Sequence, residues 1–240
     1  MLILSPEVDL EPQERLVLAV DTTDVWQAHQ YAKVAKSAGA KIIKLGLEHE
    51  SLDGPRPCSE LAEDNGLEWI ADFKTYATSK TIAPVITRYT SLAHPPIGIT
   101  ISLHSGEQSL RIAQEIAGQK NIAIFGVGHL SVIDNIETEM YEGMGAHSYF
   151  MMQIERAVNT GIQGMVCSGL EVADVASAGL VSLVVATRSR GVEIVGDDQK
   201  RVTTPAEARL SGATLIEVGR QVIEAENPVG EMRRIREEIA

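Results

Sequence analysis

The triplet Asp72-Phe73-Lys74 places a carboxylate and an ammonium group two positions apart, at the end of an apolar run that begins at Leu67. Side chains two apart in a strand point to the same side, so Asp72 and Lys74 should be neighbours. Lys44, near the end of another apolar run, would add a second cation. An alternating Lys–Asp–Lys array holds a carboxylate beside a reacting centre and keeps a lysine charged for proton donation. The array is therefore a candidate acid–base site, and the alternative is a structural ion pair.

Positioning such an array requires strands that end at a common edge. The chain contains eight short apolar runs, at residues 16–21, 41–45, 67–72, 97–103, 121–127, 163–167, 181–186 and 214–218. Helical stretches are expected at 25–38, 58–65, 79–88, 108–117, 148–160 and 170–177, from 205 and from 220, with a long connection at 128–147. Apolar strands alternating with helices indicate a covered parallel sheet, and eight units favour closure into an α/β (β/α)8 TIM barrel. We predict one barrel domain over residues 1–240, with 1–14 as an N-terminal extension.

Functional residues of a TIM barrel cluster where its strands end. Five predicted strand ends carry such residues: Asp21, Lys44, Asp72 with Lys74, His104, and Gly219-Arg220. These ends converge on one mouth, which predicts a single site. Arg220 should also open a helix, where free N–H groups favour an anion, and the loops after strands seven and eight are the usual phosphate site of this fold. We therefore predict a phosphate site at Gly219-Arg220, against the alternative of a solvated turn.

The composition restricts the function. The formal net charge of −12 argues against binding to nucleic acid or to an anionic membrane. No apolar run reaches the ~20 residues needed to cross a bilayer, and the acidic N-terminus does not resemble a signal peptide. Cys58 and Cys167 are expected to be unpaired thiols in a reducing cytosol, and the histidines lack metal-ligand spacing. We expect a soluble cytoplasmic protein without a metal site, in which His104 is a structural residue.

Several short blocks occur in order along the chain: LAVD at 18–21, KIIKLG at 41–46, IADFK at 70–74, VCS at 166–168, DQKRVTTP at 198–205 and VGR at 218–220. Together they resemble the orotidine 5'-monophosphate decarboxylase family, in the family's order and spacing over nearly the whole chain. The resemblance implies decarboxylation of orotidine 5'-monophosphate to uridine 5'-monophosphate in de novo pyrimidine biosynthesis. It also implies that no metal or organic cofactor is needed, and that a homodimer shares its active sites across a two-fold axis.

The resemblance assigns roles to the charged array. Lys74 would protonate the carbanion that is left at C6 of the pyrimidine after carbon dioxide departs. Asp72 would lie against the departing carboxylate, and Lys44 would complete the charge network.

Further roles concern the rest of the nucleotide. By the resemblance, Asp21 would bind the ribose hydroxyls. Gln199 and Arg220 would hold the 5'-phosphate, helped by the backbone of Gly219.

The chain departs from the family motif Asp-x-Lys-x-x-Asp, because Ala77 stands at the final Asp position. In the family that Asp reaches across the dimer interface into the partner's site. The following residues 78–80 differ as well, although Thr81 matches and is assigned to the substrate. Ala77 is either an engineered substitution or the mark of a divergent homologue with weakened activity or another ligand. We predict much slower decarboxylation than in a family member with Asp at this position.

The loop after strand seven also departs. Family members carry Thr-Pro-Gly-x-Arg there, whereas this chain reads TRSRG at 187–191. Arg190 is the predicted phosphate ligand, and Arg188 is the alternative after a one-residue shift. The connection 187–203 is the candidate lid. After strand five, His129 follows two glycines where the family often has a hydroxyl residue that reads the pyrimidine.

Two other functions stay open. Asp72-x-Lys74-Thr75 also resembles the motif of the hexulose phosphate synthase and keto-gulonate phosphate decarboxylase group, which uses Mg2+. The block at 198–201 favours the nucleotide enzyme instead. The second alternative is a non-catalytic homologue that binds a nucleotide phosphate but has lost the chemistry at Ala77.

Overall fold

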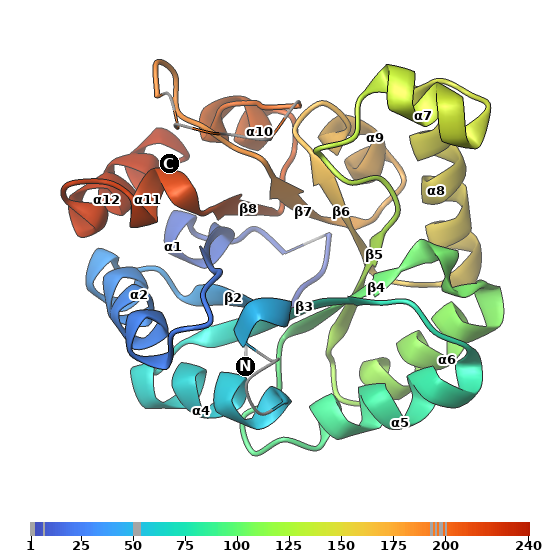
Figure 1. The fold of residues 1–240 in the computed structure, drawn as a ribbon, viewed down its shortest axis with the longest axis horizontal. Coiled ribbons are helices and arrows are strands. Elements are labelled where there is room, and N and C mark those ends of the chain that lie inside the picture. The colour runs from blue at the N-terminus through green and yellow to red at the C-terminus, as the bar shows by residue number, and fades with distance from the viewer. Residues whose placement is uncertain are drawn as a thin grey trace.

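The computed structural model describes residues 3–6, 8–49, 54–192, 194, 196, 199 and 201–240. The described strands form one closed parallel barrel in chain order, with β8 paired to β1 (Figure 1). They are β1 (Leu16–Val20), β2 (Ile42–Gly46), β3 (Glu68–Thr75), β4 (Gly98–Ser102), β5 (Ala123–Val127), β6 (Gly164–Ser168), β7 (Val181–Val185) and β8 (Leu215–Val218). The predicted TIM barrel is confirmed, and each predicted strand coincides with an observed one.

Helices surround this barrel (Figure 1). They are α1 (Pro12–Arg15), α2 (Val25–Ala38), α4 (Pro55–Asn65), α5 (Ser79–Thr90), α6 (Glu107–Gly118), α7 (Asn135–Glu142), α8 (Ala146–Thr160), α9 (Val172–Ser177), α10 (Pro205–Leu210), α11 (Arg220–Ile223) and α12 (Pro228–Glu238), with the 3-10 helix η1 (Leu103–Ser105). The sequence did not predict α7, which lies inside the expected connection 128–147. The Asp134 side chain caps α7 by accepting from the Glu137 N–H.

The closing helix predicted from Arg220 is two helices in the structure. α11 ends at Ile223, and α12 begins at Pro228 after the Asn227 side chain accepts a hydrogen bond from the Gly230 N–H. A proline fits the first helical turn, where its missing N–H removes no hydrogen bond. The sequence pattern predicts a single helix here because both helices carry apolar residues at helical spacing.

The strands divide the core into two layers because successive side chains point to opposite faces. The outer layer, between strands and helices, includes Leu18, Ile43, Trp69 and Ile216. The layer inside the barrel includes Val17, Ile42, Ile70, Phe125 and Leu215, together with Leu4 and Leu10 of the N-terminal segment. The inner layer is a packed apolar floor, as is usual for this fold.

The next inward positions along β1, β2, β3 and β8 are Ala19, Lys44, Asp72 and Glu217, which line a common cavity. The barrel therefore changes from an apolar floor to a charged layer within two residues along each of three strands. This step places the charges at the carboxyl ends of the strands.

Cys58 and Cys167 are buried, and neither forms a disulfide bond in the part of the chain that the structure describes. Over the part of the chain that the structure describes, we find no helix with the length and apolarity that a membrane span requires.

Candidate active site

The barrel mouth holds a compact group of charges on β2 and β3. Lys44 Nζ lies 2.5 Å from Asp72 Oδ2, and Lys74 Nζ lies 2.8 Å from the same oxygen. Thr100 of β4 donates to the other carboxylate oxygen, Oδ1, at 2.9 Å. The Lys44 and Asp72 side chains are buried, whereas 40% of the Lys74 side chain is exposed. The expected proximity of Asp72 and Lys74 is therefore observed, and Lys74 is the member of the array that is open to a ligand.

β3 is not a regular strand at this point. Lys74 has φ 44°, in the left-handed region, and the β3–β4 pairing shifts register between Ala71 and Thr75. A non-glycine residue in this region costs about 1–2 kcal/mol. The Lys74 N–H donates to Thr100 Oγ1 at 2.9 Å, and the same hydroxyl donates to Asp72. One buried threonine thus supports both ends of the Asp72–Lys74 pair, a role that the sequence did not reveal because threonine is common in strands.

Glu217 of β8 also faces this group, although the sequence pattern did not predict a place for it in the site. Its Oε1 lies 3.7 Å from Lys44 Nζ, and Asp21 Oδ1 lies 3.9 Å from the same nitrogen. Only 14% of the Glu217 side chain is exposed. A signal was present in the sequence, because Glu217 is a charged residue within the apolar strand 215–218 and lies two residues before the predicted phosphate site.

The neighbours of each group set its ionisation. Burial disfavours the charged form of Lys44, but Glu217, Asp72 and Asp21 outweigh burial and raise the pKa of Lys44 above its usual value. Burial alone would raise the pKa of Asp72, but Lys44 and Lys74 hold it well below its usual value. Burial raises the pKa of Glu217 to about 7, with Asp72 and Asp21 adding to the rise and the two lysines opposing it. Asp72 is therefore ionised at neutral pH, and Glu217 is poised to titrate there.

A cavity of about 820 Å³ lies over this group, within the size range of small-molecule sites. Seven of the nine predicted site residues line it: Asp21, Lys44, Asp72, Lys74, Gln199, Gly219 and Arg220. Arg220 begins α11, as predicted, and Gly219 precedes it. Among the described residues, no group of three or more His, Cys, Asp or Glu side chains is arranged to hold a metal ion.

Two predicted residues lie outside this cavity. Arg190 is 90% exposed, and its guanidinium lies 3.8 Å from the carboxylate of Glu207. Arg188, the alternative, is 9% exposed and lines the cavity. Its guanidinium donates to the Thr187 carbonyl at 2.7 Å. The geometry therefore favours Arg188 over Arg190 as a ligand-binding cation.

The other outlier is Thr81, which is exposed in the first turn of α5. Nearby, Ala77 packs against the outer core layer, and its N–H donates to Ser105 Oγ at 3.3 Å. Neither residue lines the cavity of its own chain.

The connection 187–203 is tied together where it leaves the barrel. Thr187 and Thr203 form an isolated parallel bridge, and the Arg188 N–H donates to the Thr203 carbonyl at 2.9 Å. Near the end of the connection, Arg201 forms a buried ion pair with Glu171. Both ends of the candidate lid are therefore anchored on the barrel.

Contacts also link this connection to the loop after β5. The Ser131 hydroxyl donates to the Gln199 side chain, and Arg201 donates to the Leu130 carbonyl at 3.4 Å. Asp198 and Lys200, which contribute to the sequence resemblance, lie outside the described residues. The described contacts place Gln199 at the cavity through a neighbouring loop rather than through a strand.

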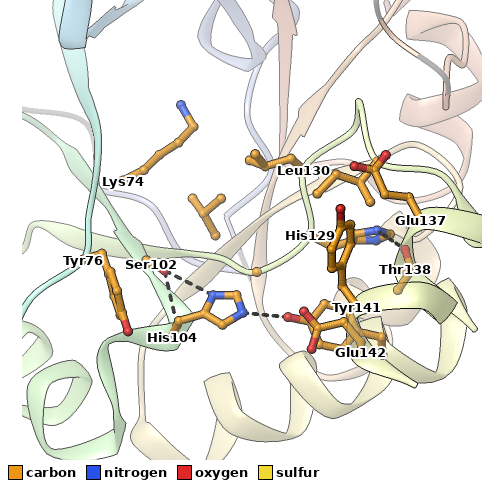
Figure 2. A pocket seen from close by; sticks show the side chains of 14 residues that line it. Lys74, Tyr76, Ser102, His104, His129, Leu130, Glu137, Thr138, Tyr141 and Glu142 are labelled. Atoms are coloured by element: carbon orange, nitrogen blue, oxygen red, sulfur yellow. Dashed lines mark hydrogen bonds between the residues drawn. The ribbon is translucent and has the colours of Figure 1, made fainter. Parts of the chain in front are cut away.

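A second cavity, of about 740 Å³, adjoins the first and shares Lys74, Val127, His129 and Leu130 with it. Figure 2 shows Lys74 across this cavity from Glu137 and Tyr141 of α7. His104 Nε2 lies 2.7 Å from the Tyr149 hydroxyl, which agrees with the expected structural histidine at the mouth.

His129 lines both cavities, and its Nε2 lies 2.9 Å from the Thr138 hydroxyl (Figure 2). Burial, together with the charge of Arg201, lowers the pKa of His129 to about 4. His129 is therefore neutral at physiological pH. His129 lines the cavity just after β5, where the sequence did not predict which residue recognises the pyrimidine base.

Residues 14–235 match the model of the Orotidine 5'-phosphate decarboxylase / HUMPS family. The chain is 30% identical over 214 residues to the orotidine 5'-phosphate decarboxylase of Wolbachia pipientis subsp. Culex pipiens, covering 89% of this chain and 93% of the relative. It is 29% identical over 240 residues to that of Rhodopseudomonas palustris strain HaA2, covering 98% of each.

Solved structures share the fold. The orotidine 5'-phosphate decarboxylase of Lactobacillus acidophilus superposes with a TM-score of 0.79 at 18% identity, over 94% of this chain and 99% of that one. The enzyme of Methanocaldococcus jannaschii, complexed with the inhibitor BMP, gives a TM-score of 0.73 at 18% identity, over 94% and 98%. The family match over residues 14–235 and the 30% identity with the Wolbachia enzyme show that the chain belongs to the orotidine 5'-phosphate decarboxylase / HUMPS family.

Proposed function

We propose that this protein decarboxylates orotidine 5'-monophosphate to uridine 5'-monophosphate. The observation that carries the proposal is the shared carboxylate: Lys44 Nζ and Lys74 Nζ lie 2.5 and 2.8 Å from one oxygen of buried Asp72. This array lies in the cavity that also contains Arg188 and Arg220. A charged group suited to proton donation and two arginines suited to binding a phosphate therefore line the same cavity, which supports the proposal.

In the proposed reaction, the bond between C6 of the pyrimidine and its carboxylate carbon breaks. Carbon dioxide leaves, and the electron pair stays on C6. Asp72, held ionised by its two lysines, lies beside the substrate carboxylate and repels it. The Lys74 ammonium donates a proton to C6, and its partly exposed amine then regains a proton from water. Atoms and charge balance without a metal or an organic cofactor.

The phosphate supplies binding energy at a distance from the reacting carbon. Arg220, which begins α11, offers a guanidinium, and Arg188 offers a second guanidinium. Asp21 is proposed to bind the ribose, because its half-exposed carboxylate can accept hydrogen bonds from ribose hydroxyls. Binding energy from the phosphate can then help to hold the pyrimidine against Asp72.

The test is the loss of orotidine 5'-monophosphate absorbance with purified protein in the presence of EDTA. We expect EDTA to leave the turnover rate unchanged. Turnover that requires added Mg2+ and a sugar phosphate would favour the hexulose phosphate branch of the family instead. Calorimetry with uridine 5'-monophosphate separates the remaining alternative, since tight binding without turnover would indicate a non-catalytic homologue.

We also propose that the chain forms a homodimer. Thr81 is exposed at the start of α5 and does not reach its own cavity, which fits a role in a neighbouring chain's site. Large apolar side chains are exposed nearby and on α7, among them Tyr76, Ile136, Met140 and Tyr141. Sedimentation at micromolar concentration should show a dimer, and a monomer would contradict this part of the proposal.

A further inference from the structure

Glu217 has an unusual position for a carboxylate. It occupies an inward-facing place on β8, directly above the apolar floor formed by residues such as Val17 and Leu215. One of its oxygens, Oε2, is fully buried and has no hydrogen-bond partner among the residues that the structure describes. Buried polar atoms are nearly always hydrogen-bonded, so an exception requires a physical explanation.

The lysine nearest to Glu217 is already engaged. Lys44 Nζ bonds to Asp72 at 2.5 Å and lies 3.7 Å from Glu217 Oε1. Asp72 receives two ammonium groups and a hydroxyl, whereas the contact described for Glu217 is the longer one with Lys44. When charge in this group changes, Glu217 therefore gives up its ionised form more easily than Asp72 does.

The charges facing Glu217 can be counted. Two ammonium groups, Lys44 and Lys74, face the three carboxylates Asp21, Asp72 and Glu217. The other ionisable residues that line this cavity are Glu48, His129, Arg188, Arg220 and Glu224. With Glu217 ionised, the inner group carries one net negative charge, and with Glu217 protonated it carries none. An anionic ligand group placed beside Asp72 adds another negative charge to the same small volume.

We propose that Glu217 is a proton-linked positioning residue, which is ionised in the empty site and takes up a proton when an anionic ligand group binds beside Lys44 and Asp72. Protonation removes the competition for Lys44, which then stays with Asp72. Protonation also gives the Glu217 carboxyl group an O–H that can donate a hydrogen bond. The proposal rests on the proposed function for the identity of the ligand, a carboxylated pyrimidine nucleotide.

The ionisation of the empty site agrees with this geometry, since burial raises the pKa of Glu217 to about 7. A bound anion raises the pKa of Glu217 further, because a nearby negative charge disfavours the ionised carboxylate. Binding is therefore strongest below pH 7 and weakens as pH rises from 7 towards the pKa of the complex. In that window each pH unit should weaken binding by about tenfold, because one proton is linked to one binding event.

The first test needs no substrate. Protein labelled with carbon-13 at the glutamate carboxyl carbons is titrated by NMR, and the Glu217 signal is assigned by its absence in Glu217→Gln. We expect a midpoint near neutral pH. A midpoint near the ordinary glutamate value of about 4.3 would overturn the proposal, whatever the protein acts on. Glu217→Met gives the same assignment if the glutamine variant is unstable.

The second test uses turnover of orotidine 5'-monophosphate. Between pH 7 and 8.5 the KM of the wild type should rise about tenfold per pH unit, and the KM of Glu217→Gln should stay nearly flat, with kcat changed much less. Glu107→Gln, at an exposed position of α6, is the matched control and should keep the wild-type profile. Parallel rises in wild type and Glu217→Gln would contradict the proposal. A complete lack of turnover would contradict the proposed function, and the NMR midpoint would then decide the present inference.

Discussion

The strand-borne and loop-borne parts of the candidate site are built differently. Lys44, Asp72 and Glu217 project from three strands whose register fixes their distances, and all three are largely buried. Arg188 and Gln199 come from the connection after β7, and contacts with other loops place them. The comparison teaches that spacing in sequence determines geometry on a strand, whereas in a loop it specifies only which residues are available.

The largest expected effect concerns the strand-borne group. Lys44→Ala leaves Asp72 with one partly exposed lysine and leaves Glu217 without its nearest cation. Removing one partner of a buried ion pair typically costs about 3–5 kcal/mol of stability. Urea unfolding measures this loss. Lys80→Ala, at an exposed position of α5, is the control and should change stability by less than about 0.5 kcal/mol. Equal effects of the two substitutions would remove the distinction between the cluster and an ordinary surface.

The loop-borne part can be tested with a pair of arginines. Arg188→Ala should raise the KM for orotidine 5'-monophosphate by about 10–100-fold, because a charge-assisted hydrogen bond contributes roughly 1.5–3 kcal/mol. Arg190→Ala should leave KM within about twofold, since its side chain is solvated and a surface ion pair contributes little. The reverse ranking would show that closure of the loop exchanges the two arginines.

Glu217 predicts a pH dependence of stability. Its pKa in the folded protein, about 7, is higher than in the unfolded chain. Its contribution to stability is therefore fully present below about pH 4.3 and is lost as pH rises to 7. Glu217→Gln should remove this loss, so the variant gains on the order of 3 kcal/mol relative to wild type between those pH values. Urea unfolding of both proteins at pH 4.5 and pH 8 checks the difference, and a constant difference would contradict the assignment.

The smallest expected effect is at position 77. Ala77→Asp adds a carboxylate near the site and should raise kcat/KM by about fivefold, as expected for an interaction of about 1 kcal/mol at a partly exposed position. Ala77→Asn adds similar volume without charge and is the control. An unchanged kcat/KM in Ala77→Asp would show that the missing carboxylate does not limit this protein.

The sequence predicted the barrel and the Asp72–Lys74 pair because alternation and strand ends are local signals. It did not predict the left-handed backbone at Lys74, since that depends on Thr100 from another strand. It also missed Glu217, whose neighbours become visible only when β8 closes against β1. In the connection after β7 it ranked Arg190 before Arg188, because a motif offset was the only guide, and the structure places Arg188 in the cavity. The sequence did not predict α7, because the large apolar residues of this helix are exposed and do not form a clear stripe that faces the core.

The central claim is that Lys74, held by Asp72, donates the proton in decarboxylation. Carbon dioxide release from carboxyl-labelled orotidine 5'-monophosphate, measured for wild type and Lys74→Ala side by side in EDTA, tests it most directly. The account predicts release by the wild type and a kcat lower by about 10²–10⁴-fold in the variant, the usual contribution of a positioned general acid. Equal release by the two proteins, or none by either, would contradict it.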